Sequence, residues 1–476
     1  MTGLTPRTAL VLALLVAAPC TEAQPAPKSF EAVVREHVSI ALGDNLALQR
    51  QDMAVEESLA ALDAVRARYF PEIALNARYT RADGGRQIDF PLGALLNPAY
   101  QTLNQLLVAQ GQAPRFPSIG DQSFAFQRPR EQDTRVTLRQ PLYQPAIPAA
   151  VAAQRELLGV QRFAREAFAR QLLRDVTTGY AQYLKARRAT AIVRSALALL
   201  DENQRVTDSL FRNGRITQDQ VLRARSERLA AEQQLRETES AANQAAAYVN
   251  FLLNRAQDTP LDEADAPQEG TLETDLRAAR DSALRQRPEL EQLDALGRAA
   301  DASQRIARAA LGPQLALGVD AGTQGEQYRM GSGYNYVAAS LVLTWKLFDG
   351  GAARAEAGKA RLAARDVRLQ REDALQRVQL EVQQAVDRLR TAHDSLATAQ
   401  AREEAAAATF RIAARKRDEG AISQMEFLDA RNALTSAQLN LNVTRYALAA
   451  CRAELDHATG SGTLPPPGHD AEGPPR

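Results

Sequence analysis

The sequence predicts a mainly α-helical fold that is interrupted by a few amphipathic β-strands. Two long stretches, 149–213 and 352–419, contain no proline and almost no glycine, which favours very long helices. The same order of elements occurs twice along the chain, as expected for a duplicated unit. Four short segments alternate between apolar and polar residues with the period of a strand.

The two halves of the chain keep a common register of landmarks. Pro71 matches Pro313 at a shift of 242 residues, and Leu142 matches Leu347 at a shift of 205. The first half must therefore carry 37 additional residues between its two strands. We place them in a long loop at 83–132.

The N-terminal residues have the pattern of a signal peptide, which we expect to cover 1–23. Arg7 supplies the positive charge, a short apolar stretch follows, and a small-residue cleavage site ends at Ala23. Cys20 raises the alternative of a lipidated cysteine, although the preceding Pro19 fits such a site poorly.

Composition changes divide the remaining chain into four parts. The segment between the repeats is acidic and contains Pro260 and Pro267, so we expect a linker at mid-body. After Gly460 the chain is rich in proline, which is typical of disorder. The predicted parts are a first repeat at 24–257, the linker at 258–274, a second repeat at 275–460 and a disordered tail at 461–476.

The helices are predicted in two lengths. Each long stretch would extend roughly 100 Å at the rise of an α-helix, which indicates a coiled-coil-like assembly. The shorter helices, about half as long, are expected at 30–69, 219–254, 276–311 and 425–459. Pairs of short helices stacked end to end beside each long helix would give a bundle of uniform height.

The four strands are expected near 73–80, 136–142, 314–321 and 337–347. Each has one apolar and one polar face and is long enough to cross a bilayer as part of a barrel. A small soluble sheet covered by a helix is the alternative. Four strands cannot close a barrel, whereas three chains would supply 12, and a barrel in lipid must close.

Composition argues against several other classes of function. The net charge of +1 argues against nucleic-acid binding. The four histidines have no metal-ligand spacing, and Cys451 has no neighbour that would activate its thiol. No phosphate loop or nucleophile–base motif occurs, so we expect neither an enzyme nor a cofactor. The histidines are His37, His393, His457 and His469.

Taken together, these features resemble the TolC-like outer-membrane efflux proteins over essentially the whole mature length. The resemblance rests on the twofold repeat, on the helix–strand junctions at Pro71 and Pro313, and on matched strand ends and turns. The matched segments are Leu142-Tyr143 and Leu347-Phe348, 213–217 and 419–423, and 221–224 and 427–430.

The resemblance implies a homotrimer with a 12-stranded outer-membrane β-barrel that continues into a periplasmic α-helical barrel. Such proteins are passive exit ducts of tripartite efflux pumps or type I secretion systems. They dock a periplasmic adaptor (membrane fusion) protein and an inner-membrane transporter of the RND, ABC or MFS class. The rival interpretation is a soluble periplasmic coiled-coil scaffold or adaptor, although the β modules of an adaptor are absent.

A turn that contains one glycine separates each long helix from the shorter helix after it. Glycine permits the left-handed residue of a tight turn, and Thr217 or Ser423 can cap the next helix. The resemblance implies that these turns form the periplasmic tip and dock the adaptor. The two turns are Gly214-Arg215-Ile216-Thr217 and Gly420-Ala421-Ile422-Ser423.

Glu426 and Asp429 are three residues apart, so they share one face of the helix after the second turn. The resemblance implies that they project into the lumen, where threefold symmetry would give two stacked carboxylate rings at a cation-selective periplasmic aperture. The matching residues of the first repeat are Gln220 and Arg223. The alternative is a solvated helix N-terminus, where carboxylates are favoured anyway.

In a barrel, the loop at 83–132 would be extracellular because it joins the first two strands. Its apolar stretch at 100–108 is expected either to form a short helix over the barrel mouth or to be an ordinary surface loop. Trp345, at a strand end, fits an aromatic girdle at the membrane interface.

Overall fold

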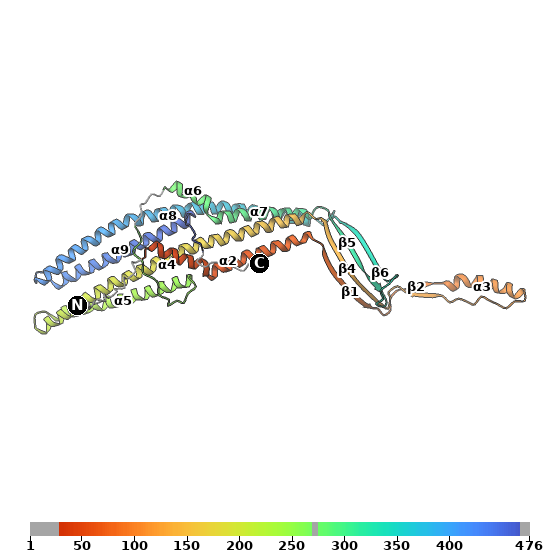
Figure 1. Ribbon diagram of the computed structural model, residues 1–476, viewed down its shortest axis with the longest axis horizontal. Helices are drawn as coiled ribbons and strands as arrows, with labels where there is room; N and C mark the ends of the chain where they lie inside the picture. Colours follow the sequence, from red (N-terminus) through yellow and green to blue (C-terminus); the bar gives the residue numbers. More distant parts are fainter. Residues whose placement is uncertain (1–27, 269–274, 467–476) are drawn as a thin grey trace, which may run out of the picture. The chain divides into compact units, whose positions relative to one another are not determined.

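The computed structural model describes residues 28–268 and 275–466 (Figure 1). They form two compact units, to both of which the long helices contribute. Unit 2 consists of Leu46–Ala169 and Arg280–Glu381, and unit 1 contains the other described residues. The predicted signal peptide and Cys20 lie outside the described residues, as do the last part of the linker and the end of the tail.

The two predicted long helices are present, and each has 67 residues. Pro148 lies in the first turn of the first one, where its missing N–H removes no helical hydrogen bond. Beyond it, no proline interrupts either helix. These helices are α4 (Ala146–Arg212) and α8 (Ala352–Asp418).

Two of the shorter helices have the predicted extent within two residues at each end, and two are broken. The unbroken ones are α5 (Gln218–Leu252) and α9 (Gln424–Thr459). The predicted helix at 276–311 is divided into α6 (Leu276–Gln286) and α7 (Pro288–Ala309). Pro288 explains this break, because proline is tolerated at a helix start but not inside a helix.

The predicted helix at 30–69 is also wrong as a single element. Asn45 separates α1 (Phe30–Asp44) from α2 (Leu46–Arg66), and a short 3₁₀ turn, η1 (Ala67–Tyr69), follows. The buried Asn45 amide donates a hydrogen bond to the carbonyl of Leu252 at 2.9 Å. This contact joins residues 207 apart in the chain, so local sequence could not reveal the break.

Unit 2 contains one four-stranded antiparallel sheet with strand order β1-β4-β5-β6 (Figure 1). The predicted alternation is kept in register across it: Leu75 faces Val136, Val136 faces Ala321, and Ala321 faces Val337. The strands are β1 (Glu72–Arg81), β4 (Arg130–Tyr143), β5 (Gln314–Gly325) and β6 (Asn335–Thr344).

The last strand is shorter than predicted, because β6 ends before Trp345. The indole Nε1 of Trp345 donates to the carbonyl of Leu311 at 3.1 Å, next to the junction between α7 and β5. Pro71 lies directly before β1 and Pro313 directly before β5.

The insertion between β1 and β4 contains a hairpin and a helix. The predicted short helix at 100–108 is the second half of a longer one, α3 (Leu92–Ala109). It is flanked by a two-stranded antiparallel ribbon of β2 (Gln87–Phe90) and β3 (Gln122–Ala125).

Arginine–carboxylate pairs connect successive helices of unit 2. They link α2 to α4, α4 to α7, and α7 to α8. All of these pairs are partly exposed, so each contributes little to stability and mainly fixes helix alignment. They are Asp52–Arg165 at 2.6 Å, Glu156–Arg298 at 2.7 Å and Asp301–Arg368 at 2.9 Å.

In unit 1 the described part of the linker packs against an aromatic cluster on α1 and α4. The hydroxyl of Tyr180 donates to the carbonyl of Asp262 at 2.8 Å, and that of Tyr183 donates to Leu261 at 3.3 Å. His37 contacts the ring of Tyr180 edge-on, with centroids 5.0 Å apart. Burial lowers the pKa of His37, so this histidine favours the neutral form.

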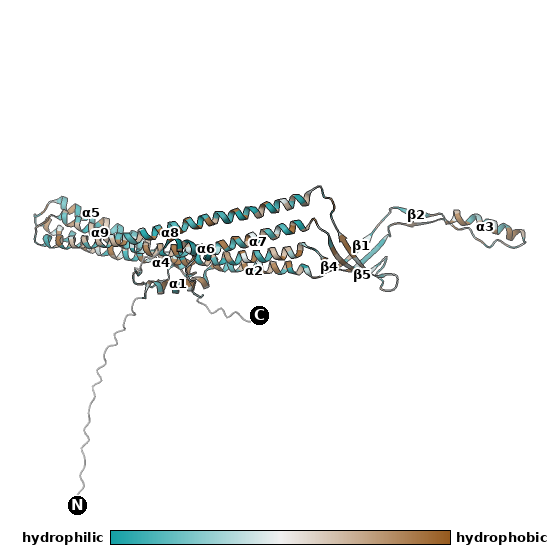
Figure 2. Ribbon diagram, turned by 90° about the horizontal axis from the view of Figure 1, so that it is seen from above, coloured by the Kyte–Doolittle hydropathy of each residue, from teal (hydrophilic) through white to brown (hydrophobic). Residues whose placement is uncertain are grey.

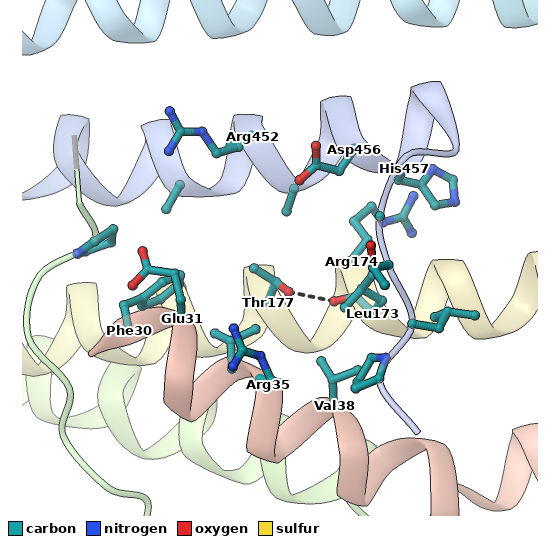
Figure 3. A pocket seen from close by; sticks show the side chains of 18 of the residues that line it. Phe30, Glu31, Arg35, Val38, Leu173, Arg174, Thr177, Arg452, Asp456 and His457 are labelled. Atoms are coloured by element: carbon teal, nitrogen blue, oxygen red, sulfur yellow. Dashed lines mark hydrogen bonds between the residues drawn. The ribbon is translucent and has the colours of Figure 1, made fainter. Parts of the chain in front are cut away.

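The predicted tail begins with residues 461–466, which the structure describes without regular secondary structure. This segment closes one side of a cavity of about 600 Å³ between α1, α4 and α9, which Arg35 and Arg452 also line (Figure 3). The Arg170 guanidinium donates to the carbonyls of Gly460 and, at 3.2 Å, Gly462. The segment therefore fastens the end of α9 to α4.

Candidate functional site at the helix turns and the sheet

Both predicted turns have the same backbone structure. Gly214 and Gly420 have left-handed φ angles of 68° and 73°, and each ends a long helix with the hydrogen bonds of a Schellman motif. The amide of Arg215 donates to the carbonyl of Leu210 at 3.0 Å, and that of Ala421 donates to Lys416 at 2.7 Å. The sequence repeat is therefore also a repeat of backbone geometry.

The residues after the two glycines differ in their capping. The Ser423 hydroxyl accepts from the amide of Glu426 at 3.3 Å, and the Glu426 carboxylate accepts from the amide of Ser423 at 3.2 Å. This capping box satisfies two donors of the helix start. The expectation that Thr217 also caps its helix is wrong, because its side chain makes no capping bond.

Most residues of the two turns are exposed. Gly214, Arg215, Thr217, Gly420, Ala421 and Ser423 are exposed, whereas Ile216 and Ile422 are half-buried. Ile422 packs against an apolar cluster that contains Leu200, Phe427 and Leu428. The isoleucine thus anchors the second turn while the surrounding residues remain accessible.

Both predicted aperture carboxylates lie on the exposed side of α9. Glu426 is engaged with its own helix start through the capping box. Asp429 is exposed and makes no ion pair with any other described residue. In this single chain, Asp429 is therefore the less constrained of the two.

Phe427 lies between the two carboxylates in sequence but points into the bundle. Its side chain is fully buried, and its ring contacts Phe410 of α8 with centroids 5.7 Å apart. The guanidinium of Arg417 lies 4.0 Å from the centre of the same ring, a cation–π contact. Phe427 therefore fixes the face of α9 that carries Glu426 and Asp429.

Sequence reasoning missed Arg431, which lies two residues after Asp429 and is only 5% exposed. Its Nε atom has no hydrogen-bond partner among the described residues, and burial lowers the pKa of its guanidinium. It lines a cavity of about 330 Å³ together with Glu227 of α5. A charged residue about two turns into an amphipathic helix normally indicates exposure, so no local signal predicted its burial.

One face of the sheet in unit 2 is apolar and exposed. Side chains on this face include Ile73 at 67% exposure, Leu75 at 72% and Leu341 at 65%. A soluble sheet buries such a face against a helix, yet within the described chain nothing covers it. The apolar face therefore requires a partner or lipid.

The opposite face of the sheet is polar and concave. Residues from all four strands line one hollow of about 500 Å³, so the sheet curves around its polar side. The Thr137 hydroxyl donates to the Asp320 carboxylate at 2.6 Å and accepts from the Asn76 amide at 3.2 Å. These residues and Ser340 form a water-compatible surface.

In the residues that the structure describes, no cluster of three or more His, Cys, Asp or Glu side chains could hold a metal ion. Within the same residues, no helix combines the length and the hydropathy needed to cross a membrane. The single described free thiol, Cys451, is half-buried in α9, where burial raises its pKa.

Comparison with known proteins gives a family match over part of the chain. Residues 279–461, most of the second repeat, match the family described as outer membrane efflux protein. Among curated proteins the comparison found no match.

The fold is that of solved outer-membrane channels. The structure of the Campylobacter jejuni CmeC channel is similar with a TM-score of 0.77 and 16% identity, over 98% of this chain and 96% of that one. Vibrio cholerae VceC matches with a TM-score of 0.71 and 16% identity, over 91% and 99%. The open state of Neisseria gonorrhoeae MtrE matches with a TM-score of 0.70 and 17% identity, over 90% and 89%.

These findings confirm the resemblance to TolC-like outer-membrane efflux proteins. They also agree with a mainly helical chain that carries a few strands. The family and the similar structures are channel proteins. The roles of individual residues must be argued from this chain's own geometry.

Proposed function

We propose that this chain is the outer-membrane exit duct of a tripartite efflux pump or type I secretion system. Three copies would close a 12-stranded barrel in the outer membrane and continue as a helical conduit in the periplasm. The protein would be a passive channel that joins a periplasmic adaptor and an inner-membrane transporter of the RND, ABC or MFS class.

The observation that carries this proposal is the sheet of unit 2. It has an exposed apolar face, a concave polar face and two edge strands, β1 and β6, that each pair on one side only within the described chain. Open edges are not tolerated in lipid because their backbone groups find no partners there. Closure by neighbouring copies would pair both edges, place the apolar face in lipid and line a channel with the polar face.

The exposed turns at Gly214 and Gly420 are proposed as the tips that dock the adaptor. Each turn offers an accessible backbone that a rigid Schellman motif holds in place. Their shared geometry supports this role, because one type of adaptor hairpin could engage both turns of every copy.

Glu426 and Asp429 are proposed to form the periplasmic aperture. Threefold symmetry would repeat both carboxylates three times around the axis, giving a negative constriction that selects cations. The buried Phe427 supports this role because it orients the face that carries both groups. The loop at 83–132 would lie on the extracellular side.

Fractionation and conductance test the proposal together. We expect the mature protein in the outer-membrane fraction, released only by detergent, and ion-conducting in planar bilayers. Release by osmotic shock as a soluble species without conductance would instead favour a periplasmic coiled-coil scaffold. A membrane-bound protein that conducts no ions under any applied voltage would also contradict the duct.

A further inference from the structure

Helix α3 in the loop between β1 and β4 is held in a defined position. Asn97 exchanges two hydrogen bonds with the backbone of Ile119, both at 2.8 Å. Two helical turns later, the Asn104 side chain donates to the carbonyl of Phe116 at 2.7 Å and accepts from the amide of Phe116 at 3.1 Å. The chain returning from α3 is thus fastened along one side of the helix.

The start of α3 is fixed in the same way. The carboxylate of Asp121 accepts from the amides of Gly93 at 2.9 Å and Ala94 at 3.3 Å, which caps the helix from 28 residues away. A Cβ atom at position 93 would lie only 2.6 Å from the carbonyl of Ile119. This close packing indicates a built structure rather than an ordinary surface loop.

A second side of α3 is apolar and partly exposed, with Leu92 and Leu96 half-buried. Its apolar residues recur at alternating intervals of four and three, which is the spacing of a coiled-coil seam. Leu103 is 42% exposed and Leu106 is 56% exposed, and Gly93 is the only buried residue of this helix. Figure 2 shows hydrophobic residues along α3. We call the following residues the α3 seam: Leu92, Leu96, Ala99, Leu103 and Leu106.

The absence of charged residues around α3 indicates what kind of partner the α3 seam binds. From residue 91 to residue 114 the chain contains no Asp, Glu, Lys or Arg. A helix that binds an anionic membrane surface typically carries Lys or Arg on its polar face, and α3 carries none. Identical uncharged helices, by contrast, can meet at a symmetry axis without repulsion between like charges.

The place of α3 in the chain points to the same partner. Its ribbon joins β4 to β1, the open edge strand through which copies would pair in the trimer proposed above. In that trimer, α3 of each copy would follow the strand that lies at the interface between copies. The barrel would bring the three helices together at a high effective concentration.

We infer that the α3 seams of three copies pack against one another as a short three-helix bundle on the extracellular side of the barrel. This inference rests on the proposed trimer and adds a second, extracellular constriction to it. The three ribbons would support the bundle, and solutes would leave through the gaps between them or after the helices separate.

Cysteine crosslinking of the full-length protein tests the bundle. In a Cys451→Ser background, Leu103→Cys and Leu96→Cys place thiols on the seam, whereas Gln101→Cys places one on the opposite side of α3. Under mild oxidation in the outer membrane, we expect subunit dimers on non-reducing gels for both seam variants, about tenfold more than for the control.

Each outcome of this experiment is decisive. Equal crosslinking of seam and control variants in an intact trimer would overturn the bundle while leaving the duct unaffected. A fluorophore at position 103 that lipid-embedded quenchers reach more readily than one at position 101 would assign α3 to the membrane instead. Detergent particles of monomer mass would overturn the proposed duct, and the bundle with it.

Conductance gives a second measurement that does not depend on thiol geometry. Leu103→Glu would place three like charges at the axis and separate the helices, so single-channel conductance should rise about twofold or more. Gln101→Glu adds the same charge on the other side and should leave conductance near that of the parent. Equal conductance in both variants would overturn the extracellular constriction.

Discussion

The turn at Gly214 and the turn at Gly420 have the same backbone hydrogen bonds, yet the helices after them bury different faces. At matching positions, Leu222 is 56% exposed whereas Leu428 is 3% exposed. Arg225 is exposed whereas its counterpart Arg431 is buried. Duplication thus preserved the turn, which depends on one glycine, while the packing behind each turn diverged.

This difference indicates that the two repeats have different structural roles. The second turn is stabilised by a capping box and a buried aromatic residue, and it carries the carboxylates. The first has neither cap nor acidic pair, and Ala224 brings its return helix close to the bundle. If this is correct, matched substitutions outside the two glycines should have unequal effects in the two repeats.

The largest expected effect concerns ion selectivity. Replacing both Glu426 and Asp429 by Lys would change two negative rings into positive ones, so we expect a cation-preferring channel to become anion-preferring in planar bilayers. Gln220→Lys together with Arg223→Lys is the matched control in the first repeat and should change selectivity little. An unchanged reversal potential in the first variant would remove the aperture assignment.

The largest expected effect on stability is that of Phe427→Ala. Removing a fully buried ring should lower the free energy of unfolding by about 3–5 kcal/mol, because it leaves a cavity between α8 and α9. Val221→Ala, at the matching half-buried position, should cost about 1 kcal/mol. Urea unfolding in detergent, followed by far-UV circular dichroism, measures both variants. Equal losses of stability would contradict the different packing behind the two turns.

Arg431→Met should raise stability, in contrast to most core substitutions. The guanidinium is buried without an ion-pair partner in the described chain, so an apolar side chain of similar length should stabilise the fold by about 1–3 kcal/mol. Arg225→Met, on the exposed face of α5, should be neutral. A marked loss for Arg431→Met would mean that a neighbouring copy supplies a carboxylate.

The glycine substitutions should affect the two turns equally. Gly214→Ala and Gly420→Ala each place a Cβ on a residue with left-handed φ, and open space surrounds both positions. The cost is therefore backbone strain alone, about 1–2 kcal/mol at each turn. A difference above about 1 kcal/mol between the two urea-unfolding free energies would contradict the shared backbone.

The smallest expected effect is that of the caps. Ser423→Ala removes the hydroxyl that accepts from the Glu426 amide and should cost about 1 kcal/mol. Thr217→Ala removes a hydroxyl that makes no capping bond. It should change the free energy of unfolding by no more than a few tenths of the Ser423→Ala effect. Urea unfolding measures both variants. A larger loss of stability for Thr217→Ala than for Ser423→Ala would contradict the conclusion that only the second helix has a side-chain cap.

Features that depend on local sequence were predictable. Proline-free stretches predicted α4 and α8, alternation predicted four strands with the observed faces, and glycine predicted both turns. The capping box at Ser423 and Glu426 follows from a local sequence pattern as well. Pro288 also carried a signal for a break, which the prediction of a continuous helix neglected.

Features that depend on long-range contacts could not be predicted. The break at Asn45 relies on a carbonyl 207 residues away, and the start of α3 relies on Asp121. The burial of Arg431 and the missing cap at Thr217 follow from how each return helix rotates against its neighbours. The contact between Arg170 and the segment 461–466 is likewise long-range.

The central claim is that three copies share their edge strands to close one channel. Native mass spectrometry of the detergent-solubilised protein, with detergent removed in the gas phase, measures the number of chains directly. We expect a single species of three chains that persists on dilution. A species of one chain, stable without detergent, would contradict it.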